Sequence, residues 1–244
     1  MTGKLTVIGI GPGGPLDRTH RAEAALLDAD LVAGYDLYLE HIADLLEGKE
    51  TLSTGMTAEV KRCRAALQAA TSGRKVALVS SGDAGIYGMA GLALEMAAAE
   101  GFSVPIEVVP GVSAASAAAA ALGAPLMLDW ACLSLSDLLV DWATIRARLE
   151  AVASADLVAA LYNPRSRRRV RQFEEAVEIF LRHRPGTTPV GIATALGAPE
   201  ESITLSTLER LCGEAVGMRS LVIIGNRSTR VEQGRLITPR GYAL

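Results

Sequence analysis

The sequence predicts an α/β fold in which short buried strands alternate with helices. Short apolar runs end repeatedly in glycine, asparagine or serine, helical patterns separate them, and Pro110-Gly111 interrupts the alternation near the middle of the chain. Such an alternation is typical of parallel sheets with right-handed crossovers. Because 244 residues suffice for two domains, we expect a boundary at the interruption, with domains at 1–112 and 113–244.

The expected elements follow from the apolar pattern. In the first half, strands are predicted at 5–10, 30–34, 75–80 and 106–109, and helices at 19–29, 57–71 and 90–100. In the second half, an alanine-rich helix with Ser113 as a suitable N-cap comes first. Further helices are predicted at 142–152 and 166–183, and strands at 131–135, 156–162, 189–194, 202–205 and 220–224.

Composition and charge exclude several classes of function. The formal net charge is −3, whereas proteins that bind nucleic acid usually carry a basic excess. The three cysteines, Cys63, Cys132 and Cys212, are isolated, so no disulfide framework and no metal site are predicted, and a reducing cytoplasm fits. The most apolar stretch, 112–128, is largely alanine and contains Pro125, which argues against a membrane span.

The segment Gly9-Ile10-Gly11-Pro12-Gly13-Gly14 follows the first predicted strand and formally matches the GxGxxG fingerprint of dinucleotide-binding proteins. A nicotinamide-dependent oxidoreductase is therefore one alternative. Pro15 argues against it, because a residue before proline is pushed out of the helical region and the next helix must start later. Pro12 removes a backbone N–H that would face a pyrophosphate. Asp36, the candidate for the ribose-binding acid of the fingerprint, lies further from the glycines than the usual ~20 residues. We interpret the segment as a rigid turn that lets another molecule approach the backbone.

A second glycine-rich turn, 80–88, follows the strand predicted at 75–80 and precedes a helix. Glycine-rich turns at the carboxyl ends of two parallel strands point at one crevice, so we expect both turns to serve the same ligand. Asp83 lies within the second turn. Its carboxylate either caps the following helix or lies near a cationic ligand.

Four motifs, in order over nearly the whole chain, resemble the tetrapyrrole methylase family. They are Gly9-Ile10-Gly11-Pro12-Gly13, Ser80-Ser81-Gly82-Asp83-Ala84-Gly85-Ile86-Tyr87, Pro110-Gly111-Val112-Ser113-Ala114 and Leu161-Tyr162-Asn163-Pro164. Within this family, motifs at 34–38, 55–63, 133–139 and 238–242 resemble the enzymes that methylate C17 of precorrin-3B. Ala84 and Val140-Asp141 depart from the family pattern, and neither departure removes a reactive group.

The resemblance implies a two-domain fold, each domain with a mostly parallel or mixed sheet flanked by helices, and S-adenosylmethionine in the interdomain cleft. It also implies a homodimer and methylation at C17 with ring contraction towards precorrin-4 in cobalamin biosynthesis. Methylation at C11, C4 or C20, or of a cobalt-containing precorrin-3, stays open, as does a tetrapyrrole carrier without activity. The cofactor contacts carried over from the family are Gly11, Pro12, Gly13, Ser81, Gly82, Asp83, Ile86, Ser113, Ala114, Tyr162, Asn163, Ala195 and Leu196.

Methyl transfer from a sulfonium is an in-line displacement. It needs alignment of the reacting atoms and exclusion of water rather than a catalytic triad. Ring contraction also needs proton transfers, and the sequence does not choose among the candidate groups Asp83, Tyr35, Tyr38, His41, Glu59 and Asp137.

A basic cluster after Asn163-Pro164 is predicted to open the helix at 166–183. Its members are Arg165, Arg167, Arg168, Arg169 and Arg171. One interpretation is a solvated helix face that Glu174 and Glu175 partly neutralise. The other is that Arg165 and Arg168 bind acetate and propionate groups of a tetrapyrrole, because a guanidinium suits bidentate contact with a carboxylate. Tyr35 and Ser136 are further candidates for substrate contact.

Overall fold

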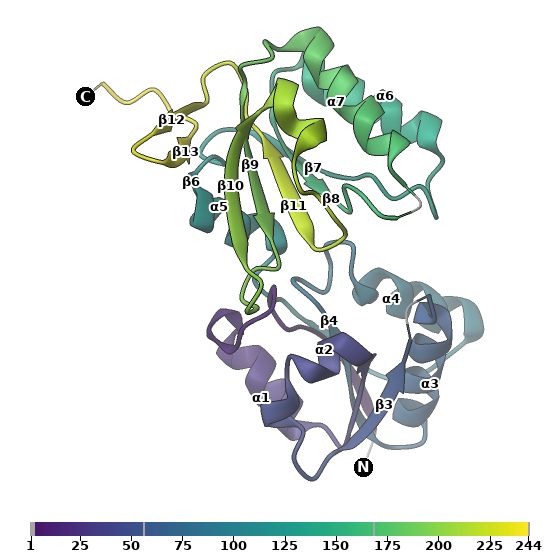
Figure 1. Ribbon diagram of the computed structural model, residues 1–244. Coiled ribbons are helices and arrows are strands. Elements are labelled where there is room, and N and C mark those ends of the chain that lie inside the picture. The colour runs from purple at the N-terminus through teal and green to yellow at the C-terminus, as the bar shows by residue number, and fades with distance from the viewer. Residues whose placement is uncertain (1–2, 56, 168, 244) are drawn as a thin grey trace. The chain divides into compact units, whose positions relative to one another are not determined.

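The computed structural model describes residues 3–55, 57–167 and 169–243, and it confirms the α/β prediction (Figure 1). The chain forms two compact units, Met1–Ala114 and Ala115–Leu244. Each unit has its own sheet and its own hydrophobic core. The division falls shortly after Pro110-Gly111, the pair on which the expected boundary rests.

The sheet of the first unit has five parallel strands in the order β3-β2-β4-β1-β5. The strands are β1 (Lys4–Gly9), β2 (Leu31–Tyr35), β3 (Glu50–Thr54), β4 (Lys75–Ser80) and β5 (Ile106–Val109). The three inner strands are rich in branched apolar residues and are buried, as expected for parallel strands covered on both faces. The sequence pattern does not predict β3, because Glu50, Thr51 and Ser53 make this edge strand polar and exposed.

Helices cover both faces of this sheet. They are α1 (His20–Asp28), α2 (Asp36–Glu40), α3 (Glu59–Thr71) and α4 (Met89–Glu100). On one face α3 and α4 pack against each other (Figure 1) and bury Leu67 and Ala93. On the other face α1 and α2 bury Leu26 and Leu39. The first unit is therefore a sheet between two helical layers, with its strand ends free to carry loops.

The sheet of the second unit is mixed, with the order β10-β9-β11-β8-β7. Only β7 and β8 pair in parallel, and the other pairs are antiparallel within the described residues. The strands are β7 (Trp130–Ser134), β8 (Val158–Tyr162), β9 (Pro189–Thr194), β10 (Ser202–Thr207) and β11 (Ser220–Ile224). A separate small sheet joins β6 (Gly123–Ala124), β12 (Arg230–Glu232) and β13 (Arg235–Ile237), which are too short for the sequence pattern to reveal.

The helices of the second unit pack against its larger sheet. They are α5 (Ala114–Leu122), α6 (Trp142–Ser154) and α7 (Arg171–His183). The core between α6, α7 and the sheet contains fully buried Leu149, Phe173 and Phe180. Asp141 begins α6 by accepting a hydrogen bond from the backbone N–H of Thr144 at 2.9 Å, so the departure from the family pattern at this position supplies an N-cap. None of the helices in the described ranges is long and apolar enough to cross a membrane.

The helix predicted at 166–183 begins later, at Arg171. Ser166 and Arg169 close a loop instead: the backbone N–H of Ser166 donates to the carbonyl of Arg169 at 3.1 Å, and the N–H of Arg169 donates to Oγ of Ser166 at 3.0 Å. The prediction that Arg165 and Arg167 open this helix is therefore wrong. Both side chains belong to the loop that precedes it.

A buried arginine clamps the second unit together. Arg184 follows α7 and is 4% exposed, and its guanidinium donates to the carbonyls of Gly225, Leu157 (2.6 Å) and Val152 (3.3 Å). The guanidinium also lies 4.7 Å from the ring centre of Phe180. Burial lowers the pKa of Arg184 to about 10, which still leaves it charged at neutral pH. The clamp joins the end of α7 to the segments that flank β8 and β11.

Candidate functional site

Three loops meet at the carboxyl edge of the first unit's sheet. They follow β1, β4 and β5, which are neighbours in that sheet. The loops after β1 and β4 are joined by two backbone hydrogen bonds. The N–H of Gly11 donates to the carbonyl of Gly82 at 3.1 Å, and the N–H of Gly82 donates to the carbonyl of Gly11 at 2.7 Å. The two glycine-rich turns therefore form one backbone surface.

Glycine is required here because the backbones approach too closely for side chains. A Cβ atom at Gly9 would lie 2.7 Å from the backbone nitrogen of Gly111, and one at Gly111 would lie 2.2 Å from the carbonyl oxygen of Gly82. Gly11 also has φ of +81°, a conformation that favours glycine. The neighbour that Gly9 accommodates is thus the chain's own backbone, which differs from the interpretation of this turn as a surface left open to another molecule.

Asp83 braces the loop after β4 against the loop after β5. Its Oδ1 accepts a hydrogen bond from the N–H of Gly85 at 2.8 Å, and its Oδ2 accepts one from the N–H of Gly111 at 3.0 Å. Asp83 does not cap α4, which begins at Met89 after Gly88 without a side-chain cap. The capping interpretation is therefore wrong. The Asp83 side chain is partly exposed, so it is still available to a cationic ligand.

The start of α1 differs from that of a dinucleotide-binding fold. Gly14 is extended, with φ −86° and ψ 160°, as expected before proline, and a short 3-10 turn at Pro15–Asp17 follows it. The helix begins only at His20, where Oγ1 of Thr19 accepts a hydrogen bond from the N–H of Ala22 at 3.1 Å. The fingerprint needs its last glycine against the first helical turn, so this geometry argues against the nicotinamide alternative.

The cofactor candidates of the first unit gather on these three loops. Ile86 is 39% exposed at the end of the loop after β4, whereas Ser113 is 8% exposed after the Pro110-Gly111 turn. An apolar side chain and a backbone surface are thus available side by side on one sheet edge. The candidates that the structure gathers here are Gly11, Pro12, Gly13, Ser81, Gly82, Asp83, Ile86, Ser113 and Ala114.

The second unit gathers its candidates at one edge of its own sheet. The carboxyl ends of β7, β8 and β9 share this edge, because β8 and β9 both run antiparallel to β11. The hydroxyl of Tyr162 accepts a hydrogen bond from the N–H of Ala115, the second residue of α5, at 3.0 Å. Asn163 has φ of +49°, and its Nδ2 donates to Oγ of Ser134 at 3.1 Å. The N–H of Ser136 donates to the same oxygen at 3.2 Å, so these residues form one polar group.

Ala195 and Leu196 follow β9 at the same edge. Ala195 has φ of +53°, and its N–H donates to the carbonyl of Arg219 at 2.9 Å, which fixes this left-handed turn. A cavity of about 490 Å³ begins beside it at Thr194 and continues along residues 215–220. The candidates after β8 and β9 are therefore brought to one edge, next to an open volume.

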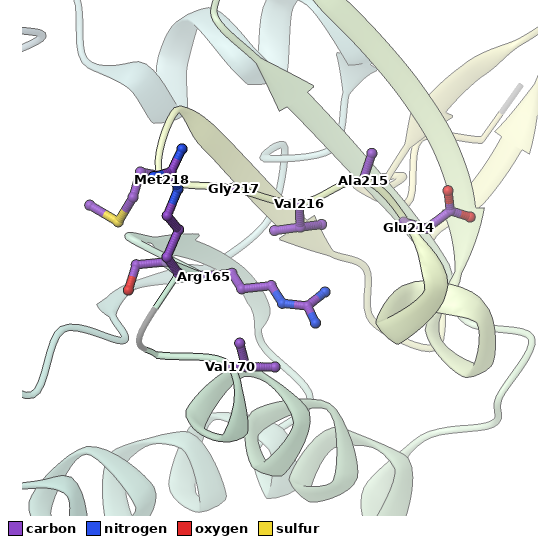
Figure 2. A pocket seen from close by; sticks show the side chains of 9 residues that line it. Arg165, Val170, Glu214, Ala215, Val216, Gly217 and Met218 are labelled. Atoms are coloured by element: carbon purple, nitrogen blue, oxygen red, sulfur yellow. The ribbon is translucent and has the colours of Figure 1, made fainter.

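Arg165 lines a neighbouring cavity of about 520 Å³ (Figure 2). The loop before α7 and residues 214–218 form its walls. In the view of Figure 2, Arg165 and Met218 lie at one end of the cavity, Glu214 lies at the other, and Val216 lies between them. The cavity therefore combines two cationic side chains, Arg165 and Arg167, with an apolar wall and the carboxylate of Glu214, and its end at Arg165 suits an anionic ligand with an apolar body.

The remaining members of the basic cluster have separate roles. Arg168 lies outside the described residues. Arg169 is 7% exposed and donates through Nη2 to the carbonyl of Asn163 at 2.7 Å. Arg171 pairs with Glu175 at 3.1 Å within α7. Only part of the cluster fits the interpretation of a solvated helix face, because Arg169 is buried and both Arg165 and Arg167 line a cavity.

The candidates for proton transfer divide between the units. Tyr35 and Tyr38 form an edge-on pair, with ring centres 5.3 Å apart, near the carboxyl end of β2. Burial raises the pKa of Tyr38, and the nearby Arg62 opposes that rise. Asp137, in the second unit, accepts a hydrogen bond from Nε2 of Gln172 at 2.7 Å.

Two other candidates lie at helix ends: Glu59 is exposed at the start of α3, and His41 follows α2.

Within the described residues, no group of three histidine, cysteine or acidic side chains is placed to hold a metal ion.

The sequence pattern does not predict that two arginines are buried, although Arg62 lies within the motif at 55–63 and Arg169 within the basic cluster. Arg62 and Arg169 are both less than a tenth exposed, and Nε of each lacks a hydrogen-bond partner. Arginine is common on helix and loop surfaces, so the pattern alone carries no signal of their burial. Arg169 holds the carbonyl of Asn163, and Arg62 reaches Thr54 at the end of β3.

Known proteins resemble this chain over nearly its whole length. Residues 4–212 match the profile of a family described as Tetrapyrrole (Corrin/Porphyrin) Methylases. A probable cobalt-factor III C(17)-methyltransferase of Salmonella typhimurium is 45% identical over 98% of this chain and 100% of its own length. A cobalt-factor III methyltransferase of Priestia megaterium is 45% identical over 99% of this chain, which spans 46% of that relative. The crystal structure of the methyltransferase CobJ has a TM-score of 0.90 at 36% identity, covering 97% of this chain and 100% of that one.

Proposed function

The chain belongs to the tetrapyrrole (corrin/porphyrin) methylase family, as its motifs predict, and we propose that it methylates C17 of precorrin-3B or of the corresponding cobalt compound. Methylases of this family use S-adenosylmethionine, and the proposal includes ring contraction towards precorrin-4 in cobalamin biosynthesis. Support comes from the Salmonella and Priestia relatives, which are named for cobalt-factor III and, in the first case, for C17. The alternatives at C11, C4 and C20 lack this support.

Three backbone loops meet at the carboxyl ends of β1, β4 and β5, and this arrangement is the main structural support for the proposal. Gly9, Gly82 and Gly111 hold these loops in direct backbone contact, and Asp83 braces them. A cationic cofactor with an amino-acid head suits such an edge, because it meets a partly exposed carboxylate, backbone groups and the apolar side chain of Ile86. The residues present therefore fit S-adenosylmethionine.

When bound, S-adenosylmethionine supplies an electrophilic methyl group on sulfur and leaves as S-adenosylhomocysteine. The contribution of the chain is to bind, to orient and to exclude water. In the first unit, Pro12, Ser81, Asp83 and Ile86 would hold the cofactor. In the second unit, the proposed contacts are Tyr162, Asn163, Ala195 and Leu196. Since C17 of the substrate is itself nucleophilic through the conjugated ring, no activated side chain is required for methyl transfer.

The substrate carries acetate and propionate groups, and we propose that Arg165 binds one of them. The cavity beside Arg165 offers a guanidinium next to Val216 and Met218, so a carboxylate and the apolar ring edge would each meet a matching surface. Ser136 and Tyr35 stay candidates for further contact, and Arg168 is proposed from the sequence alone. We also propose a cytoplasmic homodimer, for which size-exclusion chromatography with light scattering is the direct test.

Cofactor binding provides the first test. The purified chain is titrated calorimetrically with S-adenosylhomocysteine, with NADH in a parallel cell. We expect binding of the thioether in the micromolar range and no heat from NADH. Binding of NADH alone would contradict the proposal and would require the turn at Gly9 to be interpreted as a dinucleotide site. An Arg165→Met variant is expected to keep thioether binding and to lose affinity for the tetrapyrrole.

A further inference from the structure

Arg62 is a buried cation at the same sheet edge as the glycine loops. It lies in the first turn of α3, the helix that follows β3, and it is 3% exposed. Its Nη1 donates to Oγ1 of Thr54 and, at 3.4 Å, to the carbonyl of the same residue. Thr54 is the last residue of β3, so the guanidinium lies at the carboxyl edge of the first unit's sheet.

The charge of Arg62 is not neutralised by the described part of the chain. Among residues 3–55, 57–167 and 169–243, no carboxylate lies within 4.0 Å of its nitrogen atoms, and Nε has no hydrogen-bond partner. Glu59, one turn earlier on α3, is exposed and forms no ion pair with it. Buried cations are normally paired with an anion, because burial without one is costly. An anionic ligand would supply the missing partner.

The groups around Arg62 suit the carboxylate-bearing periphery of a tetrapyrrole. Tyr35 ends β2 and is the register partner of Thr54 on β3. Tyr38 packs edge-on against Tyr35, and Arg62 lies close enough to Tyr38 to oppose the rise of its pKa. One guanidinium and two phenol rings therefore share the carboxyl ends of β2 and β3, beside the strands whose loops carry the proposed cofactor contacts.

We propose that Arg62, with Tyr35 and Tyr38, forms a subsite for a carboxylate side chain of the tetrapyrrole substrate. The inference rests on the proposed function, which supplies a substrate with a rim of carboxylates. A substrate carboxylate would replace Thr54 as acceptor, since a charge-assisted hydrogen bond is roughly twice as strong as a neutral one. The phenol rings would pack against the methylene groups and the ring edge. Arg62 is a binding residue in this account, with no part in proton transfer.

The test compares Arg62→Met with Arg64→Met. Arg64 lies two residues further along α3, is partly exposed and pairs with Glu100 at 2.6 Å, so its replacement controls for a change of charge on the same helix. The probe is uroporphyrin III, a stable fluorescent tetrapyrrole with carboxylates on all its peripheral side chains, and its dissociation constant is measured by fluorescence. S-adenosylhomocysteine binding and thermal unfolding are measured on the same samples.

We expect Arg62→Met to weaken uroporphyrin III binding by about tenfold or more, and to change S-adenosylhomocysteine binding by less than about twofold. Arg64→Met should match the wild type in both. Unchanged uroporphyrin III affinity in a folded Arg62→Met protein would overturn the subsite. An equal loss of affinity for uroporphyrin III and for S-adenosylhomocysteine would overturn it too. If Arg62→Met fails to fold, Arg62→Lys takes its place in the test. We expect Arg62→Lys to bind uroporphyrin III at least about threefold more weakly than the wild type, because an ammonium lacks the planar fork of a guanidinium. Wild-type affinity in Arg62→Lys would overturn the subsite.

Ligand binding by the wild-type chain separates the Arg62 subsite from the proposed methylase activity. If the wild-type chain binds S-adenosylhomocysteine but not uroporphyrin III, the subsite is overturned and the methylase proposal stands. If the wild-type chain does not bind S-adenosylhomocysteine, the proposed function itself is contradicted, whatever the porphyrin result.

Discussion

Oδ2 of Asp83 accepts a hydrogen bond from the backbone N–H of Gly111 at 3.0 Å, across 28 residues of sequence. This bond joins the loop after β4 to the loop after β5 and so fixes the edge on which we place the cofactor. The other carboxylate oxygen is used by Gly85 within the same turn. One side chain thereby organises two of the three loops, which the sequence alone does not reveal.

Replacement of Asp83 by alanine should disorganise this edge. Two backbone N–H groups would lose their acceptor, at a cost of about 1–3 kcal/mol where water does not replace it. We expect S-adenosylhomocysteine to bind at least about tenfold more weakly, as measured by calorimetry. Asp28→Ala removes a carboxylate that pairs with Lys75 at an exposed position of the same unit, and it should leave affinity unchanged. Unaltered affinity in Asp83→Ala would show that the brace is dispensable.

A methyl group at Gly111 should be incompatible with the three-loop contact. Its Cβ would lie 2.2 Å from the carbonyl oxygen of Gly82, so the loops must separate. We expect Gly111→Ala to lower the thermal midpoint of unfolding and to abolish measurable S-adenosylhomocysteine binding. Gly91→Ala, on the exposed face of α4 with no atom near its Cβ, is the matched control and should stabilise the protein by up to about 1 kcal/mol. Normal cofactor binding by Gly111→Ala would contradict the geometry described here.

The second unit should depend on Arg184 for its stability. Arg184→Met leaves the buried carbonyl of Gly225 and the partly buried carbonyl of Leu157 without their donor. We expect the free energy of unfolding, measured in urea, to fall by about 3 kcal/mol. Arg182→Met, two residues earlier and on the surface, should change it by no more than about 1 kcal/mol. Equal effects of the two substitutions would mean that the clamp contributes little.

Alkaline pH should lower the stability of the first unit by ionising Tyr38. Burial raises its pKa above the ordinary value of 10.0, so the neutral phenol stabilises the fold below that value, and this contribution is lost as pH rises through the raised pKa. We expect the near-ultraviolet absorbance of tyrosinate to show a late-ionising step, which Tyr38→Phe removes. Tyr242→Phe, at an exposed position, should leave the late step in place. A late step that survives in Tyr38→Phe would assign it to another residue.

The sequence predicts regular elements well where apolar runs are bounded by turn residues. The strands β4, β5, β9 and β11 have the bounds expected from their patterns. The polar edge strand β3 and the short β6, β12 and β13 carry no such pattern. The helix expected from residue 166 begins later because the side chain of Ser166 accepts a hydrogen bond from the backbone of Arg169 and closes a loop. Helical spacing in the sequence gives no sign of this competing local hydrogen bond.

The candidate site could be located from its motifs but not assembled from them. The order of the glycine turns indicates that they share a sheet edge, since parallel strands end together. The contact of Gly9 with Gly111, the brace of Asp83 and the burial of Arg62 depend on packing between segments far apart in sequence. Such contacts leave no local pattern in the sequence, because glycine and aspartate are common in turns and arginine is common on surfaces whether or not they make such contacts.

The position of the transferred methyl group is the decisive test of the proposed methylation at C17. The purified chain is incubated with cobalt-factor III or precorrin-3B and with S-adenosylmethionine that carries an isotopically labelled methyl group, and the labelled carbon is located in the product by nuclear magnetic resonance. We expect a single labelled methyl group on C17 of a ring-contracted product. Label on C11, C4 or C20 would contradict the assignment to C17, and absence of transfer to either substrate would contradict the proposed activity as a whole.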